Sequence, residues 1–529
     1  MAKTLTLLLL SVAVAVQNLD ALPSSVSATD EEDYTVPPGL LIGAGTSALQ
    51  TEGAWDEEGK AESSADWFFN AVKWPENQTV AADSYHRYKD DVKKAAELKL
   101  SLYKFSISWS RVLPTADAKA PNERGVAFYN NLINAIIENG MKPMVVMYHF
   151  DHPRILEDEF MGWQSIKMAD KFAEYAGFLF KTFGDRVEHW VTINEPNMYC
   201  AYFTQLCVQA NLRKPEDVNP YECIHYNLLA HMKASQVFRK LGLKGKIGYS
   251  ALLMYAQPAT TSPEDIYAAS AFNDLHAGSS LRPVVYGDYP QVYKNMVGGR
   301  LLEFTADEKA ALAGSADFVG LNIYFGMEAS FNRFNNASAD GGTSMFLGQM
   351  SNDIPFINIA MAGSSDGGPL AAFTTINPDV MRNALLWTHQ TYKIPIVITE
   401  NGYGDVLGLG VHDMQRAAYH SAFLRMLVTT IKQYNVSVVA YSAWSLIDSF
   451  EFSGGYSRPF GLVHVDYEHG TLDRSLKDSS KFWIELGEKG YVPYVQPDNA
   501  SSSERAVSTI SVVLISCLTI FSTPWKSQL

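Results

Sequence analysis

Cysteine is scarce in this chain, which has four cysteines among its 529 residues. No two of them form a Cys-x-x-Cys pair, and none lies in a cluster with histidine, so the sequence contains no recognisable zinc motif. We therefore expect no metal ion and no organic cofactor.

Basic residues are also in the minority, with 42 Lys and Arg against 57 Asp and Glu and a formal net charge of −15. A field of this sign repels phosphate backbones and anionic lipid, which argues against a nucleic-acid partner. Proline (23) and glycine (36) are too few for a collagen-like or low-complexity chain, and 47% of the residues are hydrophobic. The composition is that of a globular protein with a large core.

The two ends of the chain differ from the rest. Lys3, the apolar run Leu5–Val16 and a short polar stretch after it predict a secretory signal peptide over residues 1–21. In the tail, residues 496–529, the apolar run Ala506–Phe521 is shorter and more polar than the roughly 20 residues of a spanning helix. Small residues precede this run, as in a lipid-anchor signal, and a weak membrane segment or a disordered tail are the alternatives. We expect a secreted protein, or one at the extracellular surface if the tail carries an anchor.

Passage through the secretory pathway predicts glycosylation and a disulfide. Four Asn-x-Ser/Thr sequons are present, at Asn77, Asn336, Asn435 and Asn499. Cys207 and Cys223 enclose a polar stretch, and we expect them to close it into a disulfide loop. Cys200 follows the Asn194-Glu195-Pro196 segment closely, so we expect it in the packed interior as a free thiol.

Residues 34–495 contain no linker, charge block or internal repeat and predict one domain. Short apolar runs rich in Val, Ile and Tyr recur along it, mostly separated by stretches of helical periodicity, which is typical of parallel strands buried on both faces. There are eight such runs: Leu40–Thr46, Leu102–Trp109, Pro143–His149, His189–Asn194, Lys246–Leu252, Asp317–Tyr324, Ile394–Thr399 and Val436–Trp444. We expect amphipathic helices at Val126–Asn139, Met168–Phe183 and Met414–Tyr434, the first two ending at a glycine. The pattern predicts an α/β fold, a single (β/α)8 TIM barrel with long βα loops, and a doubly wound sheet is the alternative.

In such a barrel the functional site lies at the carboxyl ends of the strands. Polar or aromatic side chains follow seven of the eight runs at that point: Gln50, Glu52, Trp109, Arg111, His149, Asp151, Asn194, Glu195, Asn322, Tyr324, Glu400, Asn401, Trp444 and Glu451. Any one of them could be a helix cap or a satisfied surface group. Their recurrence at one end of the barrel indicates a site.

Two carboxylates, Glu195 and Glu400, directly follow the fourth and seventh apolar runs and should face each other across the barrel mouth. Paired carboxylates across a cleft are the residues that glycoside hydrolysis requires, one as acid/base and the other as nucleophile or base. The alternatives are a buried ion pair or a metal site, and no further ligands support the latter.

Several segments resemble glycoside hydrolase family 1, the β-glucosidases and myrosinases, and the likeness is to the animal type. They are Ser47–Trp55, Lys104–Arg111, Thr192–Pro196, Ile398–Gly402 and Trp444–Glu451. The resemblance runs from about Pro38 to Pro493. It implies a retaining double displacement in which Glu195 is the acid/base and Glu400 the nucleophile.

The resemblance also implies the roles of the surrounding side chains. Lys104 and Tyr324 would support the nucleophile. A sugar presents hydroxyls on its rim and C–H groups on its face, so amides, imidazole, carboxylate and an aromatic floor suit it. The residues that would bind it are Gln50, His149, Asn194, Tyr324, Trp444, Glu451 and Phe452.

Three positions depart from the family pattern. Lys104 stands where the family usually has Arg, and Phe452 stands where it has Trp. The segment Phe150-Asp151-His152-Pro153 replaces the usual Trp-Asp-Leu-Pro. Phe452 removes an indole donor near the sugar, and Lys104 changes the charge contact of the nucleophile.

The sequence thus predicts a retaining β-glycosidase that acts on a small-molecule β-glucoside or related glycoconjugate. One alternative is a thioglucosidase (myrosinase) acting on glucosinolates. Plant myrosinases of this family carry Gln where this chain has Glu195, which favours an O-glucosidase, whereas an animal-type thioglucosidase resembles the O-glucosidases at that position and stays open. The other is a catalytically weak ectodomain that binds a sugar or a protein partner, and the presence of both Glu195 and Glu400 argues against it. The sequence leaves the oligomeric state open.

Overall fold

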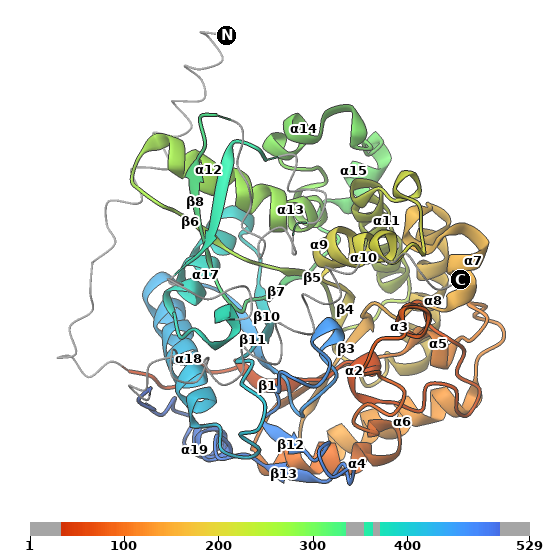
Figure 1. Ribbon diagram of the computed structural model, residues 1–529, viewed down its shortest axis with the longest axis vertical. Helices are drawn as coiled ribbons and strands as arrows, with labels where there is room; N and C mark the ends of the chain where they lie inside the picture. The colour runs from red at the N-terminus through yellow and green to blue at the C-terminus, as the bar shows by residue number, and fades with distance from the viewer. Residues whose placement is uncertain (1–32, 335–346, 348–353, 363–370, 498–529) are drawn as a thin grey trace, which may run out of the picture.

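The computed structural model describes residues 33–334, 347, 354–362 and 371–497. Eight parallel strands form a closed barrel in the order β1-β11-β10-β7-β5-β4-β3-β2 (Figure 1). These strands are β1 (Leu41–Gly45), β2 (Leu102–Ser106), β3 (Lys142–Tyr148), β4 (His189–Asn194), β5 (Lys246–Leu252), β7 (Phe318–Asn322), β10 (Ile396–Asn401) and β11 (Val438–Trp444). Each overlaps one of the predicted apolar runs, so the TIM barrel is confirmed. The predicted signal peptide, residues 498–529 of the tail and the sequons at Asn336 and Asn499 lie outside the described residues.

Helices surround the barrel because each strand is followed by a segment with one apolar face. The three predicted helices are present as α6 (Glu123–Glu138), α8 (Lys167–Phe183) and α18 (Met414–Tyr434). The chain after α6 turns at Gly140, whose φ of +79° is the left-handed conformation that glycine adopts at helix ends. Further helices around the barrel include α4 (Ser84–Glu97), α11 (Pro220–Lys240) and α17 (Asp379–Tyr392).

The inside of the barrel changes from apolar to polar along its axis. Near the amino ends of the strands the interior is closed by a buried apolar cluster: Leu102, Met144, Val146, Val191, Phe318, Val397 and Ala440. Gly248 makes this plug possible, since a Cβ there would lie 2.3 Å from the ring of Phe318. Towards the carboxyl ends the interior side chains are amides, hydroxyls and carboxylates. The floor is therefore sealed, and the barrel offers polar groups only at its mouth.

Long βα loops build a second layer around the mouth. They include α3 (Ser64–Val72) and a three-stranded sheet of β6 (Ala256–Pro258), β8 (Met327–Phe331) and β9 (Ile357–Met361). Two strands after the barrel, β12 (Val463–Val465) and β13 (Arg474–Leu476), pair with each other. Within the described part of the chain, no helix combines the length and the apolar character needed to cross a membrane.

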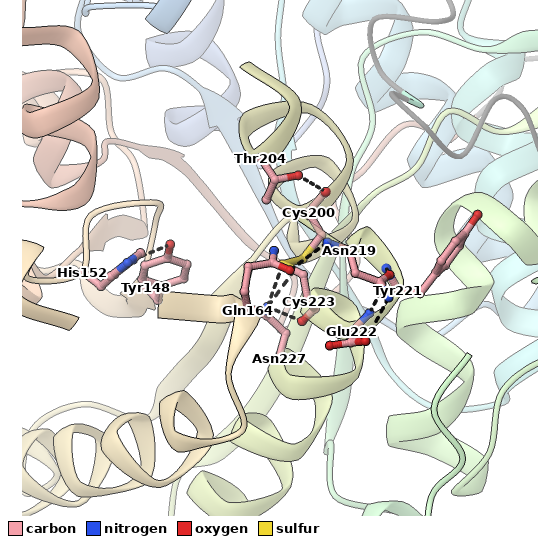
Figure 2. Close-up of a disulfide and its surroundings, with 10 residues drawn as sticks. All are labelled: Tyr148, His152, Gln164, Cys200, Thr204, Asn219, Tyr221, Glu222, Cys223 and Asn227. Carbon is pink, nitrogen blue, oxygen red and sulfur yellow. Dashed lines mark hydrogen bonds between the residues drawn. A yellow bond between two sulfur atoms is a disulfide. The ribbon is translucent and has the colours of Figure 1, made fainter. Parts of the chain in front are cut away.

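The disulfide differs from the prediction. Cys200 and Cys223 are joined, with 5.6 Å between their Cα atoms (Figure 2). Within the described part of the chain, Cys207 is the cysteine that stays a free thiol. The expected burial of Cys200 is correct, but it lies on the π-helix η2 (Tyr199–Phe203) within bridging distance of Cys223 on α11. Cys207 lies further along, on α10 (Thr204–Gln209). The Cys207–Cys223 prediction is wrong because the chain after Glu195 turns its first cysteine, and not its second, towards α11.

Candidate active site

Glu400, on β10, is held by one cation and one phenol. Lys104, on β2, is separated from β10 by β1 and β11 in the barrel. It is fully buried and places Nζ 2.6 Å from Glu400 Oε1. Tyr324, just after β7, donates its hydroxyl to Glu400 Oε2 at 2.7 Å. Both carboxyl oxygens therefore have a partner, which fixes the plane of the group at the mouth.

Glu195 follows β4 and has a left-handed φ of +45°, a conformation that turns the chain sharply after the strand. Burial, followed by the charge of Glu400, raises the pKa of Glu195 to about 8. Hydrogen bonding from Asn322 Nδ2 to Glu195 Oε1 at 2.8 Å lowers this pKa, as does the charge of Lys104, and neither outweighs burial. Glu195 is thus a protonated acid near neutral pH, opposite Glu400 with its lysine partner.

Two of the expected sugar-binding residues form a pair beside Glu195. Asn194 ends β4, and its Nδ2 lies 3.2 Å from His149 Nε2 at the end of β3. Burial, followed by the charge of Lys104, lowers the pKa of His149 well below its ordinary value, so the imidazole is neutral. A neutral imidazole both donates and accepts, which suits recognition of a hydroxyl.

The opposite wall of the site carries the indole and a further carboxyl. Trp444 ends β11 and its Nε1 donates to Glu451 Oε1 at 3.3 Å, while Ser449 Oγ donates to the same oxygen at 2.7 Å. Burial raises the pKa of Glu451 to about 8. Gln50 holds this segment, because its Nε2 donates to the carbonyl of Phe450 at 2.9 Å.

Phe452 belongs to an aromatic wall beside the sugar-binding pair. Its ring centroid lies 6.4 Å from that of His149, 5.7 Å from Phe150 and 5.3 Å from Phe203. The phenyl group supplies apolar surface at this point but no hydrogen-bond donor.

Some polar strand ends serve the scaffold instead of the mouth. Arg111 Nε lies 2.9 Å from Glu52 Oε2, and Tyr129 also donates to Glu52, so these groups form a buried ion-pair cluster. Trp109 is fully buried and stacks on Tyr175 at 4.5 Å. The position of these residues after a strand correctly indicated that they are buried near the end of the barrel. It did not indicate whether they line the mouth or pack beneath it.

The site also contains residues to which sequence reasoning gave no role. Asn322 was noted only as a polar strand end, and it contacts Glu195 directly. Ser449 belongs to the Trp444–Glu451 segment that carries the family resemblance, which implies no role for it, and its hydroxyl holds Glu451. A strand-end amide opposite a paired glutamate was the available signal for Asn322, whereas nothing in the sequence distinguished Ser449 from any other serine. Within the described ranges, no group of three or more His, Cys, Asp or Glu is arranged to hold a metal ion.

Comparison with known proteins agrees with this geometry. The model of Glycosyl hydrolase family 1 matches residues 32–491. Beta-glucosidase 5 of Oryza sativa subsp. japonica is 35% identical over 469 residues, which cover 84% of this chain and 88% of that protein. A rice β-glucosidase structure, a mutant in a covalent complex with glucose, is 33% identical with a TM-score of 0.77 and covers 85% of this chain and 98% of its own. An aphid myrosinase structure is 32% identical with a TM-score of 0.76 and covers 87% of this chain and 100% of its own. The chain belongs to glycosyl hydrolase family 1 and is a retaining β-glycosidase of the β-glucosidase type.

Proposed function

We propose that Glu400 is the nucleophile and Glu195 the acid/base in the hydrolysis of a β-glucoside with an oxygen-linked aglycone. The observation that carries this assignment is the unequal environment of the two carboxyls. Glu400 has an ammonium and a phenol on its two oxygens, whereas Glu195 is partly buried, with one amide donor and a pKa of about 8. The contacts of Glu400 suit a nucleophile, and the environment of Glu195 suits an acid.

The reaction follows in two balanced steps. In the first, Glu400 forms a bond to the anomeric carbon as the bond to the aglycone oxygen breaks, and the proton of Glu195 passes to that oxygen. In the second, Glu195 takes a proton from water, the water oxygen bonds to the anomeric carbon, and Glu400 leaves. Lys104 and Tyr324 contact Glu400 in both steps. They stabilise the carboxylate of Glu400 that re-forms when the glycosyl bond breaks.

The sugar would lie on Trp444, with its hydroxyls bound by the polar groups around the mouth. Asn194 and His149 support one side of the ring and Glu451, held by Ser449, the other. Hydrogen bonds that tighten as the ring flattens would lower the barrier. The covalent glucose complex of the rice enzyme supports glucose as the sugar.

A thioglucosidase is the second candidate, because the aphid myrosinase is among the similar structures. A thioglucoside aglycone leaves without protonation, so a protonated acid at position 195 favours the O-glucoside. Parallel assays with an aryl glucoside, cellobiose and a glucosinolate would separate the two, and turnover of the glucosinolate alone would reverse the preference.

Azide rescue tests the assignment of the two carboxyls. Glu195→Ala should retain turnover of a dinitrophenyl glucoside, and azide should accelerate it and give the β-glycosyl azide. Glu400→Ala should be inactive, and azide should give the α-glycosyl azide. The opposite stereochemistry in each variant would exchange the two roles.

We further propose that the enzyme is secreted and glycosylated. The signal-peptide pattern of residues 1–21 supports this, and so does the exposure of Asn77 and Asn435, the two sequons within the described residues. Whether residues 496–529 add a lipid anchor is open to direct test, by release of the protein from cells with a phosphatidylinositol-specific phospholipase.

A further inference from the structure

Asn322 reaches Glu195 and Asn194 with the same amide nitrogen. Its Nδ2 donates to Glu195 Oε1 at 2.8 Å and to Asn194 Oδ1 at 3.2 Å. Both hydrogens of the nitrogen are thus used on residues of the mouth. Asn322 can donate a hydrogen bond to Glu195 only while its amide presents the nitrogen, and not the oxygen, to that carboxyl.

Two hydroxyl groups inside the barrel determine that orientation. Thr399 Oγ1, on β10, donates to Asn322 Oδ1 at 2.6 Å. Ser250 Oγ, on β5, lies 2.7 Å from Thr399 Oγ1 and 3.3 Å from Asn322 Oδ1. Ser250 is the donor in its contact with Asn322 Oδ1, so both hydroxyl groups present hydrogen to the amide oxygen. Ser250, Thr399 and Asn322 are all fully buried, so water does not compete for these bonds.

The barrel wall is shaped to let these groups meet. Strands β5 and β10 both pair with β7, which carries Asn322 and Gly320 (Figure 1). A Cβ at Gly320 would lie 2.8 Å from Ser250 Cβ and 3.0 Å from Thr399 Cγ2, so any larger residue would force the two side chains apart. Ser250 also accepts the backbone N–H of Glu195 on its carbonyl at 3.0 Å. The same serine thereby supports both the backbone and, through Thr399 and Asn322, the side chain of Glu195.

We propose that Thr399 and Ser250 are positioning residues that hold the Asn322 amide in one orientation, so that the catalytic proton of Glu195 is carried by Oε2. This inference rests on the proposed role of Glu195 as the acid. An N–H donor occupies Oε1, so the proton belongs on the other oxygen. Among the described residues, Oε2 has no hydrogen-bond partner and is free to protonate the aglycone. A flipped amide would instead place its NH2 group against the Thr399 hydroxyl and its oxygen against Glu195.

We call the Ser250–Thr399–Asn322 hydrogen-bond chain the relay. The substitution Thr399→Val tests it, because valine keeps the branched shape and removes only the hydroxyl. Without the clamp, Asn322 stabilises the Glu195 carboxylate less, so the alkaline limb of kcat/KM should move to higher pH. Turnover of cellobiose, whose leaving group needs the proton, should fall about tenfold, a fraction of what a general acid contributes. Turnover of a dinitrophenyl glucoside, whose leaving group does not, should stay within about twofold.

Thr192→Val is the matched control. Thr192 is an equally buried barrel threonine, on β4, and its Oγ1 bonds His231 and the carbonyl of Gly248. It should leave the pH profile and the ratio of the two substrates unchanged. Ser250→Ala, which keeps the Thr399 bond to Asn322, is the milder second variant and should show a smaller change in the same direction.

The outcomes separate the relay from the assignment beneath it. If Glu195→Ala loses cellobiose and the dinitrophenyl glucoside equally, the role of Glu195 as acid is wrong. If Glu195→Ala loses cellobiose selectively but Thr399→Val and Ser250→Ala keep the wild-type pH profile, or lower both substrates equally, only the relay is wrong.

Discussion

Lys104 is fully buried, and Glu400 is the one carboxylate partner it has among the described residues, which makes Lys104 the most informative single position in the mouth. Nζ lies 2.6 Å from Glu400 Oε1 and 5.4 Å from the centroid of Trp444. Removing one member of a buried ion pair leaves the other charge without compensation, at about 3–5 kcal/mol. We expect Lys104→Met to lower kcat by a hundredfold or more, on the order of losing a main electrostatic contact in a catalytic site.

Lys104→Arg is the companion variant and has the opposite expectation. Its planar fork can hold Glu400 and a neighbouring group at once, whereas lysine presents a single point charge. We therefore expect kcat to rise, measured with the same aryl glucoside. Full activity of Lys104→Met would show that the lysine does not support the nucleophile.

The pH dependence of the reaction is also expected to follow from single residues. Glu195 has a pKa of about 8, raised by burial and then by the charge of Glu400, and must be protonated for the first step. Activity towards cellobiose should therefore be present below this pH and fall as the pH rises through it. A kcat/KM profile measures this directly.

Glu451 provides the control for that profile, because burial raises its pKa to about 8 as well. In Glu451→Gln the amide imitates the protonated carboxyl, so the alkaline limb should persist although the sugar binds differently. Loss of the limb in Glu451→Gln would assign it to Glu451 and not to Glu195.

The positions of single residues could be predicted from sequence where the side chain lies at the carboxyl end of a strand. Glu195 follows β4, Glu400 lies near the end of β10 and Trp444 ends β11, and the structure brings them to one mouth. Asn322 could be located but not assigned, because its role depends on which way its amide is turned, and that depends on Thr399 and Ser250 from two other strands.

At the scale of elements, the disulfide fastens the segment after β4 to α11. Cys200 and Cys223 are 23 residues apart, and α11 packs along α8 on the outside of the barrel. By the chain-entropy argument a loop of this size is worth about 3 kcal/mol. We expect the double variant Cys200→Ser/Cys223→Ser to have a lower Tm, while Cys207→Ser leaves it unchanged. A peptide map joining Cys207 to either other cysteine would contradict the pairing.

Element boundaries show why strands were easier to predict than the cysteine pairing. A strand buried on both faces is rich in apolar residues, and the bounds of β4 and β5 equal those of their predicted runs. A disulfide depends on how a loop folds back, and η2 contains no sequence pattern that distinguishes a π-helix from an α-helix. The predicted disulfide therefore contained the correct cysteine on α11, Cys223, but joined it to Cys207 instead of Cys200.

At the scale of the whole molecule, the first and last described segments pair with each other. Val36 N–H donates to the carbonyl of Gly490 at 2.9 Å, and Val492 N–H to that of Tyr34 at 3.1 Å. Tyr34 and Val36 precede β1, so this pairing lies at the amino ends of the strands, opposite the mouth. The catalytic groups and the ends of the described chain thus occupy opposite faces of the barrel, which separates substrate access from anything attached to the ends.

Glycosylation tests the secretory prediction on the whole molecule. Asn77 follows α3 and Asn435 caps α18, and both are exposed. Asn435 has a φ of +52°, a conformation that asparagine tolerates better than most residues, so its sequon is better removed by Ser437→Ala than by changing the asparagine. Thr79→Ala removes the other sequon.

Each variant, recovered from the medium, should migrate faster on a gel than wild type by one glycan, and peptide:N-glycosidase should abolish the difference. Wild-type protein whose mobility the glycosidase leaves unchanged would contradict passage of these sites through the secretory pathway.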